Sequence, residues 1–425
     1  MIDALRWVSR RGFLASAGSA AAALTAPAKP TVAAIVTEYR LLSHADVIVG
    51  RILEGYSSAG VLTAPRTRIL SMYTDQVPAK DMSRALASQY GFHIYPTIAS
   101  ALMLDGDRLA VDAVLFVGEH GNYPDNDRGQ KMYPRYELFR QIVDVMRQSG
   151  RVAPLFSDKH LSYSAEKALE MYRWTRELNI PFMAGSSIPV TIRKPALEIR
   201  AGAIIRHAVG LGYGDPDAYG FHTFEALQSM VERRRGAETG IASVEWLEGD
   251  AVWRWRDGPG RWSAPLLEAA LATGKTRPGR PEQNVAKPVA FLLKYRDGFE
   301  AACYMLDGHV SEFEFAATLE HRSAPVATRF VTELPDRKLP HFDALVHVIE
   351  EFFVTGRPLY PVERTVLVSA ALAKLFESRV KKAPVETPEL GISYRAPEHA
   401  YFEKASDEGA TVPPVQHDIR LRPAR

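Results

Sequence analysis

The sequence predicts an α/β protein of two domains, and three observations support this prediction. The chain has 425 residues, which is too long for one ordinary hydrophobic core. Strand-like and helix-like segments alternate along the first half, which is typical of a doubly wound, Rossmann-like parallel sheet. Beyond residue 192 the expected strands are longer and include a tight hairpin, which indicates an α+β domain with a large, mostly antiparallel sheet.

The first domain is expected between residues 29 and 192. Apolar runs predict its strands, and apolar residues at helical spacing predict its helices. The expected strands are 31–36, 68–73, 111–117 and 152–156, and the expected helices are 43–55, 81–90 and 136–147. Ligands of such sheets lie outside the carboxyl ends of the strands, so the residues that follow each strand are the candidates for function.

The second domain is expected between residues 193 and 382. Its predicted strands are 203–210, 289–295, 300–306 and 326–332, and its predicted helices are 342–353 and 363–376. An Arg-Asp-Gly turn at 296–298 joins the two middle strands as a hairpin. The Pro-rich stretch 383–425 is expected to be an extended tail on the surface.

The composition narrows the class of partner. Lys and Arg total 52 against 50 for Asp and Glu, so no charge excess favours nucleic acid or an anionic membrane, and a small molecule is the expected ligand. Cys303 is the single cysteine, which excludes an intrachain disulfide and a multi-cysteine metal site. Its apolar neighbours predict a buried, inert thiol.

The N-terminus resembles a twin-arginine export signal. Residues 9–14 read Ser-Arg-Arg-Gly-Phe-Leu, and a weakly apolar run at 15–24 is too short to span a membrane. Ala-Pro-Ala at 26–28 predicts cleavage after Ala28, which would leave a periplasmic or extracellular protein without a transmembrane span. The export machinery is then a partner. The alternative is a basic start to an Ala-rich helix.

Several segments, in order, resemble the glucose-fructose oxidoreductase, inositol dehydrogenase and MocA family, and together they cover most of residues 31–380. The matching segments are residues 68–75, a strand that ends in an acid, 90–95 ("YGI..Y"), 111–115 ("VDAV.I"), 158–160 ("EKP") and 179–185 ("G(V/I)..MVG"). The resemblance implies a Rossmann-like domain, a sugar or polyol ligand, and a homo-oligomer formed through an open sheet in the second domain.

The family's dinucleotide loop is missing. Dehydrogenases of this family place Gly-x-Gly-x-x-Gly after the first strand, so that backbone amides approach the diphosphate. Residues 37–44 here read Thr-Glu-Tyr-Arg-Leu-Leu-Ser-His and contain no glycine. Side chains would fill the diphosphate space, and Glu38 adds a negative charge that Arg40 would offset. Asp75 stands where a ribose-binding acid is expected. The sequence therefore predicts that this protein does not use NAD(P) as the dehydrogenases of the family do.

A polar loop at 118–130 follows one expected strand and carries Glu119 and His120 between glycines. The next strand delivers Asp158, Lys159 and His160 to the same edge of the sheet. Glu119, His120 and His160 have the chemistry of a divalent metal site for zinc, manganese or iron, provided that the glycines bend the chain. The alternatives are loop hydrogen bonds for Glu119 or His120 and an exposed loop histidine at 160.

Lys159 and His222 are the predicted catalytic residues. Lys159 aligns with the lysine that the family keeps near the substrate hydroxyl, where a general base is needed; the alternative is a surface lysine. His222 matches the family's catalytic histidine in part, because the acid expected four residues earlier is replaced by Ala218. A histidine that only supports the helix start is its alternative.

Five further residues are candidates for substrate binding: Asn122, Tyr123, Asp158, Arg193 and Glu225. Glu225 could also orient His222, bind metal or stabilise a helix end, and Arg193 could simply lie on the surface. The favoured function is a non-redox lyase, hydrolase or aldolase-type enzyme on a sugar or polyol derivative. The alternatives are an NAD(P)-dependent oxidoreductase with a tightly held cofactor and a non-catalytic periplasmic binding protein.

Overall fold

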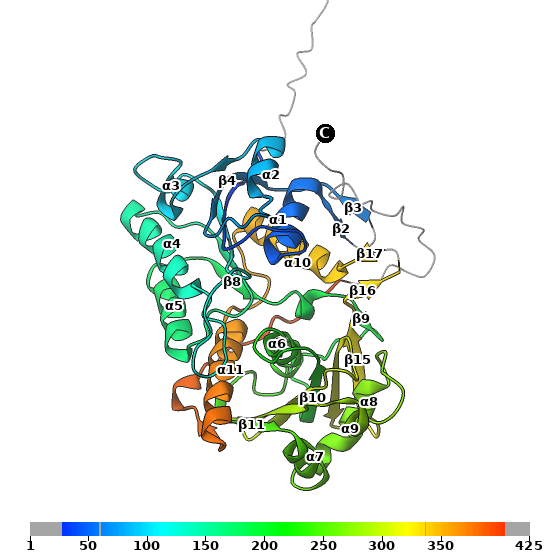
Figure 1. Cartoon of the computed structure of the whole chain (residues 1–425). Helices are drawn as coiled ribbons and strands as arrows, with labels where there is room; N and C mark the ends of the chain where they lie inside the picture. The colour runs from blue at the N-terminus through cyan, green and yellow to red at the C-terminus, as the bar shows by residue number, and fades with distance from the viewer. Residues whose placement is uncertain (1–27, 59–60, 336, 404–425) are drawn as a thin grey trace, which may run out of the picture.

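The computed structural model describes residues 28–58, 61–335 and 337–403. The expected export signal therefore lies outside the described residues, apart from Ala28. Within those residues the chain forms two large sheets, one in each half of the molecule, with helices between and around them (Figure 1). No helix in the described part of the chain has the length and apolar character needed to cross a membrane.

The first sheet is parallel throughout the described residues, in the order β5-β4-β1-β6-β7-β8. Its strands are β1 (Thr31–Val36), β4 (Arg68–Thr74), β5 (His93–Ile94), β6 (Ala113–Val117), β7 (Leu155–Asp158) and β8 (Phe182–Gly185). The strand order reverses between β1 and β6, and such a switch point opens a crevice at the carboxyl ends of the strands.

Helices cover both faces of this sheet. One face carries α3 (Ile98–Met103), α4 (Arg135–Ser149) and α5 (Ala165–Glu177), and α2 (Ser83–Tyr90) flanks β5. The other face carries α1 (His44–Glu54), which begins after the Ser43 cap and ends at Gly55. Beside α1 lies α10 (Pro340–Thr355), which returns from the distant end of the chain (Figure 1). A hairpin of β2 (Tyr56–Ser58) and β3 (Val61–Thr63) extends this layer.

The second sheet has the order β18-β11-β12-β13-β10-β14-β15-β9, and in the described residues β10 and β13 are its one parallel pair. The large, mostly antiparallel sheet is thus confirmed. Its strands are β9 (Arg193–Lys194), β10 (Ile205–Gly212), β11 (Ile241–Glu248), β12 (Val289–Tyr295), β13 (Glu300–Met305), β14 (Phe313–Leu319), β15 (Val326–Phe330) and β18 (Val385–Glu386). The turn at 296–298 joins β12 to β13, as expected.

Helices also cover both faces of the second sheet. Alternate side chains such as Phe291 and Cys303 pack on α6 (Gly220–Val231) and α11 (Glu363–Lys381). The intervening side chains, such as Ala302 and Tyr304, pack under α7 (Asp250–Asp257) and α8 (Ala264–Leu271). The short α9 (Pro281–Asn284) follows α8 along the chain. Helices α7 and α8 thus cover part of the outer sheet face, where Glu245 of β11 stays half-buried and Lys294 of β12 stays exposed, and the homo-oligomer stays a prediction.

The described part of the C-terminal segment is mostly extended and exposed or half-buried, and a few buried residues anchor it. It adds β18 to the second sheet, buries Val385 and Leu390 in the core, and ends with Glu403 bonded to Arg337. Its apolar residues give it contacts along both halves of the molecule. The remaining short elements are η1 (Ile188–Val190), β16 (Glu333–Leu334), β17 (Arg337–Lys338), η2 (Arg261–Ser263) and η3 (Pro388–Leu390).

Candidate active site

The carboxyl edge of the first sheet meets the start of α6, and the predicted site residues gather there. Glu119 and His120 follow β6, Asp158 ends β7, Lys159 and His160 come next, and His222 lies on the first turn of α6. Glu119, Asp158, Lys159, His160 and His222 are each buried. The sequence-based expectation that these residues converge is thus met by the geometry.

Glu119 is the central acid of this group. Its carboxylate forms a very short contact with Arg135 of α4, and its Oε1 lies 3.4 Å from Lys159 Nζ. Burial raises the pKa of Glu119, but the positive charges of Lys159 and Arg135 outweigh burial and hold that pKa well below its ordinary value. Glu119 is consequently a carboxylate whose charge is balanced by two cations.

Arg135 also binds the histidine that was expected to hold a metal. Its Nη1 lies 2.9 Å from His160 Nε2. Burial, followed by the charge of Arg135, keeps the pKa of His160 well below its ordinary value, so the neutral ring accepts this hydrogen bond. Across the residues that the structure describes, no group of three or more His, Cys, Asp and Glu side chains is arranged to hold a metal ion. A guanidinium thus links Glu119 and His160, and His160 is not an exposed loop histidine.

Lys159 is buried at 4% exposure, which excludes a solvated surface lysine. Its backbone adopts a left-handed conformation at φ 68°, and its N–H donates to Gly185 O at 3.1 Å. Its Nζ donates to Ala218 O at 3.3 Å and pairs with Glu119. A left-handed lysine is uncommon, because its Cβ crowds the backbone. This conformation turns the side chain from the end of β7 toward the second domain.

The chain bends at His120 and the glycine that follows it. His120 itself is left-handed at φ 71°, and Gly121 follows at φ 115°. Nδ1 of the His120 ring lies 3.3 Å from Arg40 Nη2. Burial, only partly opposed by Glu119, lowers the pKa of His120 to about 4, so the ring is neutral at pH 7.

His44 is the functional candidate that sequence reasoning missed. It is the first residue of α1, in the stretch that replaces the glycine loop, and its Nδ1 lies 2.6 Å from Asp158 Oδ2. The ring centroid is 5.4 Å from that of His120 and 6.5 Å from that of His222. The signal for His44 was its position after β1, at the same carboxyl edge as the other candidates.

His222 is held by a serine from the end of β8. Ser186 Oγ lies 2.5 Å from His222 Nδ1 and accepts a hydrogen bond from Ile188 N–H at 3.0 Å. The serine hydroxyl can donate its one proton to Nδ1, and in that arrangement the ring proton is on Nε2. Burial and the nearby Lys159 charge keep the pKa of His222 well below its ordinary value.

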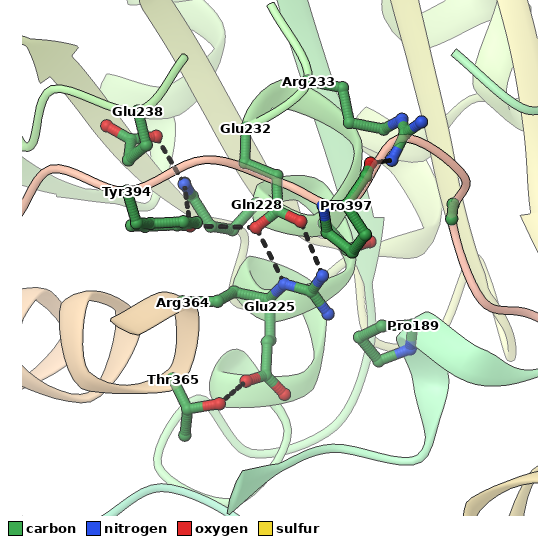
Figure 2. Close-up of polar contacts among 12 residues, drawn as sticks. Pro189, Glu225, Gln228, Glu232, Arg233, Glu238, Arg364, Thr365, Tyr394 and Pro397 are labelled. Atoms are coloured by element: carbon green, nitrogen blue, oxygen red, sulfur yellow. Dashed lines mark hydrogen bonds and ion pairs between the residues drawn. The ribbon is translucent and has the colours of Figure 1, made fainter. Parts of the chain in front are cut away.

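Glu225 lies behind His222, one turn along α6. Its carboxyl accepts from Ser186 N–H. Its Oε1 lies 2.5 Å from Thr365 Oγ1 (Figure 2). Burial raises the pKa of Glu225 to about 7, although Thr365 and Arg364 oppose the rise. Glu225 therefore positions Ser186, and no hydrogen bond joins Glu225 to His222 among the described residues.

The β1–α1 turn does not match a dinucleotide cradle. Glu38 is paired with Arg40, which offsets its charge as the sequence suggested. At the start of α1, the Ser43 hydroxyl accepts from Asp46 N–H, and the Asp46 carboxylate accepts from Leu42 N–H at 2.9 Å. Amides at this turn and helix start, which would bind a diphosphate, are thus already used by the side chains of Ser43 and Asp46, and Asp46 is an acid.

Asp75, the acid at the expected ribose position, already accepts hydrogen bonds from two tyrosines. Asp75 accepts from Tyr73 at 2.9 Å and from Tyr123 at 2.6 Å, and burial followed by this bond raises the pKa of Tyr123. Asn122 bonds Gln76 through its backbone. Tyr123 and Asn122 therefore border the site and order its loop.

Arg193 is not part of this group. Its guanidinium donates to Leu197 O and Pro189 O and stacks 4.2 Å from the ring centroid of Phe402. It is buried at the junction of the two halves, contrary to the surface alternative.

Comparisons with known proteins identify solved structures with a similar fold. No protein-family model matches the sequence, and no curated protein does. Among solved structures, GenD2 from gentamicin A biosynthesis, in complex with NAD, is 12% identical over 85% of this chain and 98% of its own, with a TM-score of 0.54. Myo-inositol 2-dehydrogenase from Lactobacillus plantarum is 12% identical over 84% and 99%, with a TM-score of 0.51.

The fold is that of the Gfo/Idh/MocA dehydrogenases. The fold expected from the resemblance is therefore confirmed over most of the chain. At this identity the likeness concerns the fold alone, and the chemistry rests on the site residues.

Proposed function

We propose that this chain is a non-redox enzyme that transfers protons on a sugar or polyol derivative, as a lyase, hydrolase or aldolase-type enzyme would. The observation that carries the proposal is the His44–Asp158 pair at the place of the missing nucleotide loop. Asp158 accepts from His44 Nδ1–H at 2.6 Å, and this bond leaves Nε2 as the basic nitrogen. A histidine oriented by a carboxylate is a common general base.

Lys159 supplies the opposite charge in this mechanism. Its Nζ is held by Glu119 and by Ala218 O, so the ammonium has a fixed position near the start of α6. There it stabilises negative charge that develops on a substrate oxygen when His44 removes a proton. With the Ser186 hydroxyl donating to Nδ1, His222 carries its proton on Nε2 and is a second donor to such an oxygen. Arg135 keeps Glu119 ionised, and through it Lys159 in place.

The experiment is a search for solvent exchange without added nucleotide. Sugars, sugar acids and polyols are incubated with the protein in D₂O, and NMR follows loss of substrate C–H signals or appearance of products. Exchange or turnover that falls by about 10²-fold or more in His44→Ala is expected, because a positioned general base contributes 10²–10⁴-fold. His93→Ala, which changes an exposed histidine of β5, is the matched control. Turnover that is equal in His44→Ala and His93→Ala contradicts the assigned base.

An NAD(P)-dependent oxidoreductase is the second candidate, because the similar structures include an inositol dehydrogenase and a protein in complex with NAD. It predicts that nicotinamide nucleotide is released when the purified protein is denatured. Release of stoichiometric nucleotide, with absorbance changes at 340 nm on adding substrate, would replace the non-redox proposal. A binding protein without catalysis is indicated if His44→Ala and Lys159→Met change only ligand affinity.

Export remains a proposal based on the first 28 residues. Replacing the Arg-Arg pair by Lys-Lys is expected to hold the protein in the cytoplasm, as cell fractionation would show. Equal export of both forms contradicts a twin-arginine signal.

A further inference from the structure

A surface pocket lies on the outer face of the second sheet, which is the face opposite to α6 and the candidate active site. Its volume is about 230 Å³, which is smaller than the roughly 300–1,000 Å³ of pockets for drug-sized ligands. Strands β11, β12 and β13 supply its floor, and residues of α7 and η2 supply one wall (Figure 1). The sheet therefore separates this pocket from α6 and His222.

Two tryptophans form the wall of the pocket. Trp255 of α7 and Trp262 of η2 have ring centroids 5.8 Å apart and nearly perpendicular planes, at 88°. A Cβ at Gly260 would lie 2.5 Å from three ring atoms of Trp255, so this glycine lets the backbone pack directly against the indole. His207 stacks on Trp262, with a centroid distance of 4.5 Å. Both indoles are thus held in place by the chain itself, and both remain only half-buried.

The floor of the pocket carries charged side chains. Glu245 of β11 is half-buried, and Lys294 of β12 and Glu300 of β13 are exposed. No hydrogen bond or ion pair joins any of these three side chains to another residue in the described part of the chain. Burial alone raises the pKa of Glu245, so no neighbouring cation compensates this carboxylate. The floor thus offers two hydrogen-bond acceptors and one donor that the protein does not use itself.

This lining favours one class of ligand. A wholly apolar ligand would leave the charged side chains without hydrogen-bond partners, and an anion would meet two carboxylates beside one lysine. A metal ion is not favoured, because no group of three or more His, Cys, Asp and Glu side chains in the described residues is arranged to hold one. A sugar ring has C–H faces that pack on indole rings, and its hydroxyl groups both donate and accept hydrogen bonds.

We propose that this pocket binds one monosaccharide unit. The sugar packs a C–H face on the tryptophan wall, its hydroxyl groups donate to Glu245 and Glu300, and another hydroxyl accepts from Lys294. The site binds the sugar without reacting with it, because the candidate catalytic residues lie beyond the sheet. It is therefore independent of the proposed function and stands whether or not His44 acts as a base.

The first test follows the tryptophans by NMR. The chain has six tryptophans, so a spectrum of protein with ¹⁵N-labelled indoles is simple enough for Trp255→Phe and Trp262→Phe to identify both signals. D-glucose, D-galactose, D-mannose, D-xylose and N-acetyl-D-glucosamine are titrated separately. A saturable shift of both signals by at least one of these sugars is expected. If none of them shifts the two signals, the proposal is overturned. A shift caused by choline alone assigns the pocket to an organic cation and also overturns it.

Variants of the lining test the contacts. Glu245→Gln and Lys294→Met change a half-buried and an exposed side chain, so both are expected to fold, and each should raise the Kd of the sugar about threefold or more. Trp255→Ala should raise it about tenfold, because packing on the indole is lost. Trp253→Ala, on the same helix but outside the lining, is the matched control and should keep the wild-type Kd. Equal Kd values in Trp255→Ala and Trp253→Ala, or a wild-type Kd in both floor variants, overturn the proposal.

Two further measurements separate this pocket from the active site and from a contact between copies. His44→Ala should leave the titration of the Trp255 signal unchanged; loss of binding in that variant would place the sugar in the active site and overturn the proposal. The outer sheet face is also where the family resemblance predicts a homo-oligomer contact. Light scattering therefore compares the mass of the wild type with that of Lys294→Met. Equal masses are expected, and a lower mass in Lys294→Met would make the pocket part of an interface and overturn the proposal.

Discussion

Asp158 Oδ2 lies 2.6 Å from His44 Nδ1, and this contact joins the end of β7 to the first residue of α1. If Asp158 orients His44 as a base, Asp158→Asn is expected to lower kcat by about 10²-fold or more while KM changes little, because the amide no longer stabilises the protonated ring. Steady-state kinetics with the substrate found by the exchange assay provide the measurement. Asp144→Asn, an exposed change on α4, serves as the control. A change confined to KM would assign Asp158 to substrate binding.

The Arg135–Glu119 contact predicts a large loss of stability when the arginine is removed. Arg135→Met leaves a buried carboxylate with only Lys159 to balance it, and breaking a buried pair costs about 3–5 kcal/mol. Arg147→Met removes an exposed partner on the same helix and should cost less than about 1 kcal/mol. Denaturant unfolding measures both. The double variant Glu119→Gln/Arg135→Met should recover part of the stability that Arg135→Met loses. If Arg135→Met and Arg147→Met cost a similar free energy of unfolding, the Arg135–Glu119 contact does not stabilise the fold.

Glu225 predicts a specific pH dependence of stability. The folded-state pKa of about 7 lies above the ordinary value of 4.5, so the folded protein binds the additional proton. Its contribution to stability is therefore full below pH 4.5 and is lost as pH rises toward 7, by roughly 3 kcal/mol at most. Thr365 Oγ1 lies 2.7 Å from Ala184 O and 2.5 Å from Glu225 Oε1, and its single proton serves one of them. A protonated Glu225 supplies the missing donor.

Glu225→Gln imitates this protonated form, because its amide N–H donates to Thr365 and its oxygen accepts from Ser186. The variant is expected to be more stable than the wild type at pH 8 and to lack the decline between pH 4.5 and 7. Unfolding free energies measured across this range test it. Parallel curves for the two proteins would assign the pH dependence to other groups.

Chelation tests the metal hypothesis. Because Arg135 binds both Glu119 and His160, treatment with a chelator is expected to leave Tm and turnover unchanged. Elemental analysis of protein purified without chelator should find less than one divalent metal per chain. A stoichiometric metal that is lost in Glu119→Gln would support the predicted metal site.

The sequence predicted those helices and strands whose bounds are set by their own local residues. Ser43 and Gly55 are typical caps, and they bound α1 as expected. Long-range packing decided the parts that were missed. Nothing local in the helices between residues 250 and 284 indicates that they cover the outer sheet face, and nothing in α10 places it beside α1. The C-terminal segment was expected to be exposed because it is rich in proline, yet Leu390 is fully buried.

The site was predictable where strand ends carry its residues, and less so where helices supply them. Alternation along the chain was enough to group five residues that end or follow β6 or β7: Glu119, His120, Asp158, Lys159 and His160. Arg135 was missed because an arginine at a helix start normally faces solvent. Its burial depends on α4 packing beside the loop after β6, which a single sequence does not reveal.

Gly185 offers a test of how tightly the two halves meet at the site. This glycine has φ 131°, and a Cβ at this position would lie 2.5 Å from Glu225 Oε1 and 2.7 Å from Thr365 Oγ1. Gly185→Ala is therefore expected to destabilise the fold by more than the backbone cost of about 1–2 kcal/mol, and to lower turnover by displacing Ser186 from His222. Gly91→Ala is the control, because Gly91 also has positive φ, at 72°, but has no atom within 4 Å of the added carbon. Denaturant unfolding should separate the two variants by at least about 1 kcal/mol. Equal losses of unfolding free energy in the two variants would mean that backbone strain alone destabilises Gly185→Ala. The added steric clash in Gly185→Ala is then absent, and α6 has room to move away from β8.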